Sequence, residues 1–183
     1  MTNDESGRPI SFVFAGATSE KDGATVRLDA QRLRASVNYR QMREGFAYPL
    51  YYNTLFAALR RELDRALADA RSGKRGLWTA KTAERDASLS GVSVRKLADL
   101  ETIRPMWTKL WRRLEEFYRK QPSGPLSAFI DFLEQKNERI DVLSVMEERG
   151  LQDLVEVRAG NKVRLVEPPE NLRVVGKAGE RRR

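Results

Sequence analysis

Short apolar runs separated by a polar turn open the chain. Residues 10–14 and 24–28 are apolar or aromatic, and the stretch between them, residues 16–23, is polar and bounded by glycines. Two such runs around a polar turn predict a β-hairpin.

Two helical segments are predicted next. Asp29 can cap a first helix, in which Leu33 and Val37 lie four residues apart and which stops at Gly45. Residues 53–73 predict a second helix, capped by Asn53 and ended by Gly73. This second helix has the clearest periodicity, because its apolar side chains share one face: Leu55, Leu59, Leu63, Ala66, Leu67 and Ala70.

Two further helices follow a polar stretch. Residues 79–91 lack periodicity and predict a linker, with a domain boundary near residue 88. Helical spacing of apolar residues then predicts one helix over residues 103–118 and another that opens near Pro125.

The last third of the chain predicts strands. Residues 140–145 form an apolar run, and residues 154–157 and 162–166 alternate around an Ala159-Gly160-Asn161 turn, as in a hairpin. The pair Pro168-Pro169 is expected to end the sheet. The sequence contains no internal repeat.

Composition limits the chemistry. The 183 residues are 40% hydrophobic and 33% charged, and no apolar run approaches the roughly 18 residues of a membrane helix. The first seven residues lack the pattern of a signal peptide, so we expect a soluble chain, cytoplasmic by default. With no cysteine and no histidine, disulfides, thiol or Ser-His-Asp catalysis and cysteine-histidine zinc sites are excluded.

The charge favours a polyanionic partner. The net charge is +8, which suits DNA or RNA, because lysine and arginine near phosphates release condensed counterions. Residues 171–183 contain five basic residues and one acidic residue, so +4 of this charge is in a predicted disordered tail. A tail that only promotes solubility is the alternative.

Four short motifs in order resemble the thermonuclease (staphylococcal-nuclease-like) family. They are Asp4-Glu5-Ser6-Gly7-Arg8, Val37-Asn38, Gly45-Phe46-Ala47 and Gly76-Leu77-Trp78. In that family a D-x-x-G-R box precedes a barrel strand, a V-N helix ends in G-L-A, and a final helix closes with G-L-W. The resemblance covers roughly residues 3–80.

The resemblance implies two site residues. Arg8 matches one of two arginines that clamp the phosphate and is the predicted catalytic residue, with a surface arginine as the alternative. Tyr51 matches a tyrosine beside the bound nucleotide, with core packing as the favoured alternative. Asn53 stands where a second such tyrosine is expected, which departs from the pattern.

No metal site is predicted. In the family, calcium is held by aspartates on strands that precede the D-x-x-G-R box, so calcium is expected only with such an N-terminal half, and no cofactor is expected in this chain. Asp4 and Glu5 are not assigned to metal. The remaining acidic residues lack the D-x-D-x-D type of spacing that calcium loops show; those considered are Asp22, Asp29, Glu115 and Glu116.

Two tryptophans raise a second nucleic-acid hypothesis. Trp107 and Trp111 lie four residues apart beside Lys109 and Arg112, which could stack bases in an electropositive groove. Aromatic residues on the apolar stripe of a helix more often pack in the core, and we favour that interpretation.

These observations give an α+β prediction. Residues 1–88 would form a partial OB-type, nuclease-like barrel without its front strands, residues 89–170 a small helical region with a β-hairpin, and residues 171–183 the disordered tail. The function expected is the C-terminal portion of a calcium-dependent nucleic-acid phosphodiesterase, inactive alone. The alternative is a non-catalytic module that binds nucleic acid, a partner chain or a second copy through unpaired strands.

Overall fold

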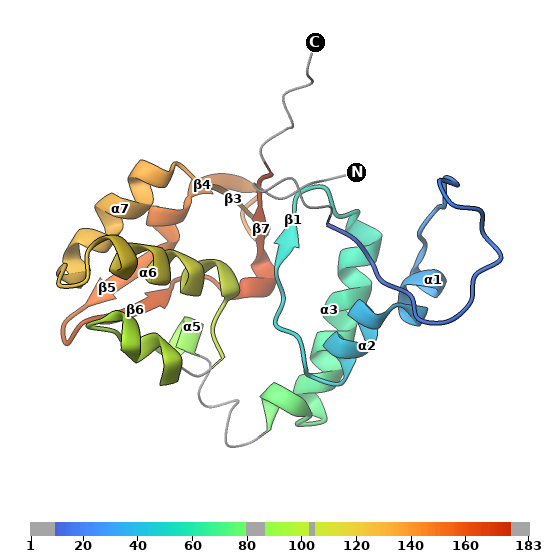
Figure 1. The fold of residues 1–183 in the computed structure, drawn as a ribbon, viewed down its shortest axis with the longest axis horizontal. Helices are drawn as coiled ribbons and strands as arrows, with labels where there is room; N and C mark the ends of the chain where they lie inside the picture. Colours follow the sequence, from blue (N-terminus) through green and yellow to red (C-terminus); the bar gives the residue numbers. More distant parts are fainter. Residues whose placement is uncertain (1–9, 80–86, 103–104, 177–183) are drawn as a thin grey trace, which may run out of the picture.

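The computed structural model describes residues 10–79, 87–102 and 105–176 and confirms a mixed α+β fold (Figure 1). The α-helices are α1 (Ala30–Ala35), α2 (Val37–Arg43), α3 (Ala57–Ser72), α5 (Ala87–Ser90), α6 (Thr108–Lys120) and α7 (Phe129–Lys136). The 3-10 helices are η1 (Gly76–Trp78), η2 (Leu97–Thr102), η3 (Leu126–Ala128), η4 (Leu151–Leu154) and η5 (Pro169–Asn171). The strands are β1 (Tyr51–Tyr52), β2 (Val92–Ser93), β3 (Arg139–Val142), β4 (Glu147–Gly150), β5 (Val155–Arg158), β6 (Lys162–Leu165) and β7 (Leu172–Val174).

Two apolar clusters form the core. One lies among α1, α2 and α3 and includes Leu33, Leu63, Leu67 and Trp78. The other lies around α6, α7 and the sheets, and Trp107, Phe117, Tyr118 and Phe129 are its largest fully buried side chains. Tyr48 packs against both clusters, so the two are continuous.

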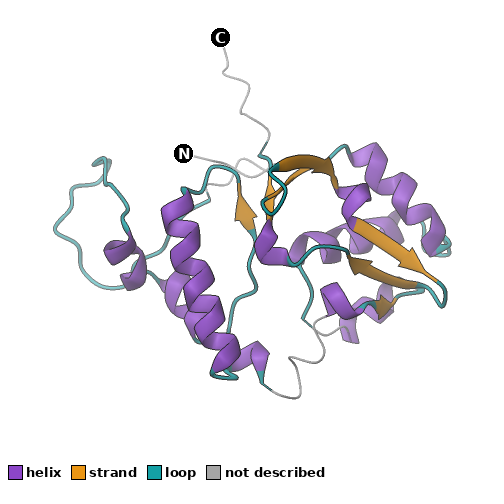
Figure 2. Ribbon diagram, turned by 180° about the vertical axis from the view of Figure 1, so that it is seen from behind, coloured by secondary structure: helices purple, strands orange, loops and turns teal. Residues whose placement is uncertain are grey.

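Two open sheets lie in the described part of the chain (Figure 2). One has the order β1-β7-β3-β4 and the other the order β2-β6-β5. In the first sheet β1 pairs in parallel with β7, with Tyr51 opposite Arg173. This pairing places α1–α3 beside the C-terminal half of the molecule (Figure 1).

The predicted hairpin at residues 10–14 and 24–28 is wrong for this structure, because neither run forms a strand. A strand needs hydrogen-bonding partners, and no described strand pairs with either run. The side chains of Ile10, Val13, Phe14 and Val26 are instead exposed.

The predicted helix from Asp29 to Gly45 is present but interrupted. Asp29 caps α1 as predicted, through a 2.8 Å hydrogen bond from the backbone N–H of Arg32. Ser36 then leaves the helical conformation, donates its hydroxyl to the carbonyl of Leu33 and accepts from the N–H of Tyr39. Serine therefore ends one helix and begins the next.

The predicted helix over residues 53–73 begins later than expected. Phe56 occupies the N-cap position of α3, and the Asn53 side chain accepts from the N–H of Gly176 instead. Gly73 ends α3 as predicted. The predicted apolar face is buried from Leu59 to Ala70, because it packs against α1 and α2.

The C-terminal half contains most of the predicted elements. α6 and α7 correspond to the two predicted helices, β3 to the predicted strand, and β5 with β6 to the predicted hairpin. Gly160 and Asn161 have the positive φ angles that this turn needs. The sheet of the predicted hairpin ends before Pro168-Pro169, but a strand of the other sheet follows these prolines. Residues 172–174, predicted to be part of the tail, form this strand β7, because β1 and β3 supply its partners.

No helix in the described ranges is both long and apolar enough to cross a membrane.

Candidate nucleic-acid interface

Arg8, the predicted catalytic residue, lies outside the described residues. The segment that follows it is anchored on the first turn of α2. Asn38 Oδ1 accepts a 2.8 Å hydrogen bond from the N–H of Val13, and the N–H of Val37 donates to the carbonyl of Val13 at 2.8 Å. The first N–H groups of a helix have no partner within it, so this extended segment satisfies one of them.

The two glycine motifs of the resemblance meet where α2 and α3 end. We call residues 44–47 and 75–78 the glycine junction. The N–H of Leu77 donates to the carbonyl of Gly45 at 2.8 Å, and Arg75 Nε donates to the carbonyl of Arg43 at 3.0 Å. The Gly45-Phe46-Ala47 and Gly76-Leu77-Trp78 motifs are therefore in direct backbone contact.

Both glycines of the junction are required by geometry. Gly45 and Gly76 have φ angles of 74° and 53°, which favour glycine. A Cβ atom on Gly45 would overlap the backbone of Arg75, and one on Gly76 would overlap the carbonyl of Gly45. The motifs thus specify a close backbone approach between two helix ends.

Trp78 fixes the junction to the core. Its side chain is only 3% exposed. Its ring lies 5.5 Å from that of Tyr48, centroid to centroid, and the Arg71 guanidinium lies 4.5 Å from its ring. The cation and the second ring hold the indole in place from the α3 side and the β1 side.

Positive charge is concentrated in the N-terminal half. Residues 10–79 contain twelve basic and seven acidic residues, a net charge of +5. Residues 87–176 contain fifteen basic and fourteen acidic residues, a net charge of +1. The field that attracts a polyanion therefore comes mainly from the part that contains the glycine junction.

Several basic side chains of the N-terminal half lie on or next to the glycine junction and form no ion pair in the described part of the chain. Arg40 and Arg43 lie on α2 and Lys74 follows α3, and all three are exposed. No hydrogen bond or ion pair joins their side chains to another described residue. Arg75 lies 4.0 Å from Glu44, the one acidic residue of the junction. These side chains can bind phosphate without first breaking a salt bridge.

Tyr51, the predicted nucleotide contact, is buried on β1. It is 3% exposed, and its hydroxyl donates to Asp64 Oδ1 at 2.9 Å. Burial raises the pKa of Tyr51, and the charge of Asp64 raises it further. Core packing, the favoured alternative, describes its position, and nucleotide contact stays a prediction.

The acidic residues considered for metal do not converge. Asp29 caps α1, and Glu115 pairs with Arg119 on α6. Across the described ranges no group of three or more acidic side chains could hold a metal ion. These residues do not fit calcium, so no catalytic step is assigned to a metal.

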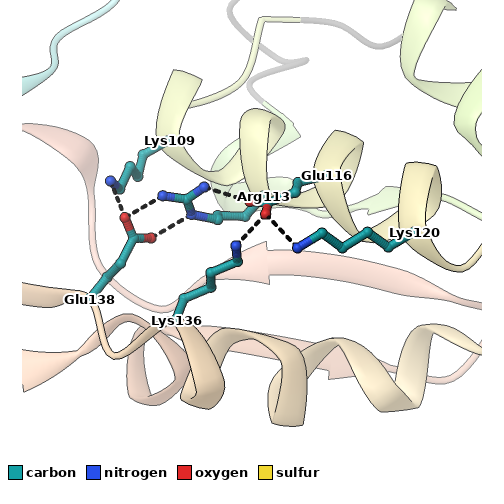
Figure 3. Close-up of polar contacts among 6 residues, drawn as sticks. All are labelled: Lys109, Arg113, Glu116, Lys120, Lys136 and Glu138. Atoms are coloured by element: carbon teal, nitrogen blue, oxygen red, sulfur yellow. Dashed lines mark hydrogen bonds and ion pairs between the residues drawn. The ribbon is translucent and has the colours of Figure 1, made fainter. Parts of the chain in front are cut away.

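Glu116 belongs to an ion-pair network that sequence analysis missed (Figure 3). Lys136 and Lys120 both contact Glu116 Oε1, and Arg113 donates to its other oxygen at 2.7 Å. Burial opposes ionisation of Glu116, but these hydrogen bonds outweigh it and lower its pKa to about 2.

The same network contains the buried carboxylate of Glu138. Arg113 binds it with two hydrogen bonds, 2.7 Å and 2.5 Å long, and Lys109 pairs with it as well (Figure 3). These cations hold the pKa of Glu138 below its usual range despite burial. The spacing of Arg113, Glu116 and Lys120 on one helix predicts part of the network. Glu138 carries no local signal, because it follows α7 and is 25 residues beyond its partner Arg113 on α6.

Trp107 and Trp111 are core residues, as favoured from the sequence. Trp107 is completely buried, and Trp111 packs at the edge of the same cluster. The interpretation of this pair as a base-stacking surface is therefore set aside.

A cavity of about 490 Å³ opens beside β2 and η2. Ser93 donates its hydroxyl to the carbonyl of Gly160 at 2.8 Å, and Thr102 donates to the carbonyl of Asp99 at 3.1 Å. Asp99 accepts from the N–H groups of Arg95 and Lys96. These polar groups are already hydrogen-bonded to neighbouring backbone atoms, so no ligand is assigned to this cavity.

Comparison of the chain with protein-family models, with curated proteins and with solved structures finds no match.

Proposed function

We propose that residues 1–88 are the C-terminal part of a thermonuclease-like, OB-type domain and that this chain binds DNA or RNA without cutting it alone. The observation that carries the proposal is the glycine junction. Two motifs that are 31 residues apart in the sequence share a backbone hydrogen bond and a close approach that only glycine permits. Chance similarity of two short motifs does not require them to touch.

The second motif pair supports the same proposal. Val37 and Asn38 anchor residues 11–13, which follow the Gly7-Arg8 box in the sequence. Three of the four motifs, Val37-Asn38, Gly45-Phe46-Ala47 and Gly76-Leu77-Trp78, therefore belong to adjoining segments of the described structure, and the Gly7-Arg8 box precedes them in the sequence. In the family, the D-x-x-G-R arginine assists at the leaving side of the phosphodiester bond, and we propose this role for Arg8.

Binding rather than hydrolysis is the activity proposed for the chain itself. Guanidinium groups neutralise phosphate charge, but water must be activated by a carboxylate or a metal before it attacks phosphorus. The described residues offer unpaired cations at the junction and no acidic cluster for a metal.

A gel-shift assay combined with a cleavage assay tests the proposal. The chain should slow the migration of a DNA or RNA fragment at low salt, and this shift should disappear as the salt concentration rises. The fragment should stay uncut when calcium is present. A gel shift that does not change with salt concentration, or no shift at low salt, would overturn the proposal. Calcium-dependent digestion that both a chelator and Arg8→Ala abolish would show that the chain is an active nuclease instead.

A protein partner is the second candidate, and one observation favours it. Residues 10–28 contain two runs with strand propensity, their side chains Ile10, Val13 and Val26 are exposed, and no strand in the described part of the chain pairs with them. An added strand from another chain or a second copy would cover them. Light scattering during size-exclusion chromatography should then show a mass above the 21.0 kDa of one chain, and Val13→Glu should restore the monomer.

A further inference from the structure

We propose that Phe46 is a stacking platform for an unpaired base, so that the glycine junction is a subsite for single-stranded nucleic acid. The inference rests on the proposed nucleic-acid binding and identifies Phe46 as the residue that contacts the base. Phe46 is the central residue of the Gly45-Phe46-Ala47 motif, and its side chain is 73% exposed. A single exposed aromatic ring is ordinary on a protein surface, so the inference depends on the fixed backbone and the unpaired cations that accompany Phe46.

Backbone hydrogen bonds hold the turn that presents Phe46. Its N–H donates to the carbonyl of Gln41 at 2.8 Å, and the neighbouring carbonyl of Gly45 accepts from Leu77 at 2.8 Å. Trp78 lies beneath, since a Cβ atom on Gly45 would stand 3.1 Å from its Cδ1. A preformed platform loses little conformational entropy when a base stacks on it.

The charge around Phe46 suits a phosphate backbone. Arg43 lies three residues before Phe46, and Lys74 and Arg75 lie on the segment that contacts the Gly45 backbone. The C-terminal ends of α2 and α3 bring partial negative charge to the junction, which these cations first offset. With Arg40 they number four against the single carboxylate of Glu44, so an excess of positive charge remains.

Ring and cations together favour a single strand over a duplex. A base shows its π-face to a protein ring only when it is unstacked, and duplex DNA keeps these faces covered. Aromatic rings beside a basic track are how sequence-independent proteins hold single strands. A duplex would engage the cations alone, with no contribution from Phe46.

Phe46→Leu tests the stacking, with Phe56→Leu as the matched control. Phe56 is 76% exposed, but the next cation along its helix, Arg60, is paired with Asp64 at 2.8 Å. Each variant is titrated with a fluorescent 12-nucleotide single strand, with the same strand carrying abasic positions, and with a duplex. The whole chain is used throughout.

We expect Phe46→Leu to weaken single-strand binding by roughly five- to 150-fold, the range for the loss of one base–ring stack. Its effect should vanish with the abasic strand and with the duplex, and Phe56→Leu should change nothing beyond twofold. A 5-iodouracil strand should also photocrosslink to Phe46 in the parent.

Three outcomes would overturn the inference. Phe46 is not a stacking platform if Phe46→Leu weakens binding of the intact and the abasic strand equally, or if the crosslink forms at another residue. The proposed nucleic-acid binding would remain in both cases. If the parent binds neither single strand nor duplex at low salt, the proposed function fails and the subsite fails with it.

Discussion

Gly76 cannot carry a side chain without disturbing the glycine junction. An alanine at this position would need a φ of 53° and would overlap the carbonyl of Gly45. We expect Gly76→Ala to lower the free energy of unfolding by about 3 kcal/mol, because left-handed strain and overpacking add. Urea unfolding followed by tryptophan fluorescence measures this loss.

Gly160→Ala separates the strain from the overlap. Gly160 also has a positive φ, 77°, but a Cβ atom there would meet nothing within 4 Å. Strain alone predicts a loss of about 1–2 kcal/mol. Equal losses in the two variants would contradict the close approach at Gly76.

Glu116 should make the free energy of unfolding depend on pH in the acid range. Its pKa is lowered from the usual 4.5 to about 2 in the fold, so its ionised form stabilises the protein above pH 4.5. That stabilisation is lost as the pH falls from about 4.5 toward 2. Glu116→Gln should therefore cost about 1 kcal/mol at pH 7 and less at pH 3, measured by urea unfolding.

Glu115→Gln is the control for this acid effect. Glu115 precedes Glu116 on α6, but its partner Arg119 has a side chain that is 64% exposed. An exposed pair contributes under about 0.5 kcal/mol, so the variant should match the parent at both pH values. A loss for Glu116→Gln that is the same at pH 3 and pH 7 would refute the role of its ionisation.

The extended segment at residues 11–13 should depend on a single side chain of α2. Asn38 Oδ1 holds the N–H of Val13 at 2.8 Å. Asn38→Ala should speed hydrogen exchange at Val13 at least about tenfold, while lowering global stability by only about 1 kcal/mol. Asn53→Ala, which removes the side-chain bond to Gly176 instead, should leave Val13 unchanged. Slow exchange at Val13 in Asn38→Ala would show that another contact holds the segment.

Helices with a clear apolar face were predictable, because their burial follows from spacing within one segment. The face of α3 from Leu59 to Ala70, and the cores of α6 and α7, are where periodicity placed them. Ser36 was not recognised as a break, since Leu33 and Val37 keep helical spacing across it. Residues 10–14 carry strand propensity, but propensity gives no strand when no described strand pairs with it.

The two halves of the chain should unfold together. β1 pairs with β7, and Arg71 of α3 forms a bidentate pair with Glu170 of η5. A fragment of residues 1–80 would lose both partners and expose the apolar surface around Tyr51. We expect poor solubility and no cooperative thermal transition for this fragment, and a sharp melt of a monomer would contradict this.

Long-range pairing is what the sequence could not reveal. β1 is two residues long, and Arg173, which pairs with Tyr51, lies beyond Pro168-Pro169, the predicted end of the sheet. The contact between Gly45 and Gly76 is long-range as well: each has a positive φ and a close backbone approach, and spacing within one segment does not encode it. The unpaired state of Arg40, Arg43 and Lys74 depends on which acidic residues the fold brings near, and no local pattern encodes it.

The salt dependence of single-strand binding measures how many phosphates the glycine junction contacts. Anisotropy titrations at several salt concentrations would compare the parent with two triple variants, each of which replaces three exposed cations by glutamine. One variant changes the junction cations Arg40, Arg43 and Lys74. The control changes Arg95, Lys96 and Lys162, which are exposed in the nearly neutral C-terminal half.

Binding by the parent should weaken as salt rises, with log Kd linear in log salt concentration. Each lost phosphate contact reduces the slope by about 0.7 on a single strand, so the junction variant should lose up to about 2 from its magnitude. The control variant should keep the slope of the parent. Equal slopes for the parent and the junction variant, or no binding at low salt, would show that the junction cations do not bind phosphate.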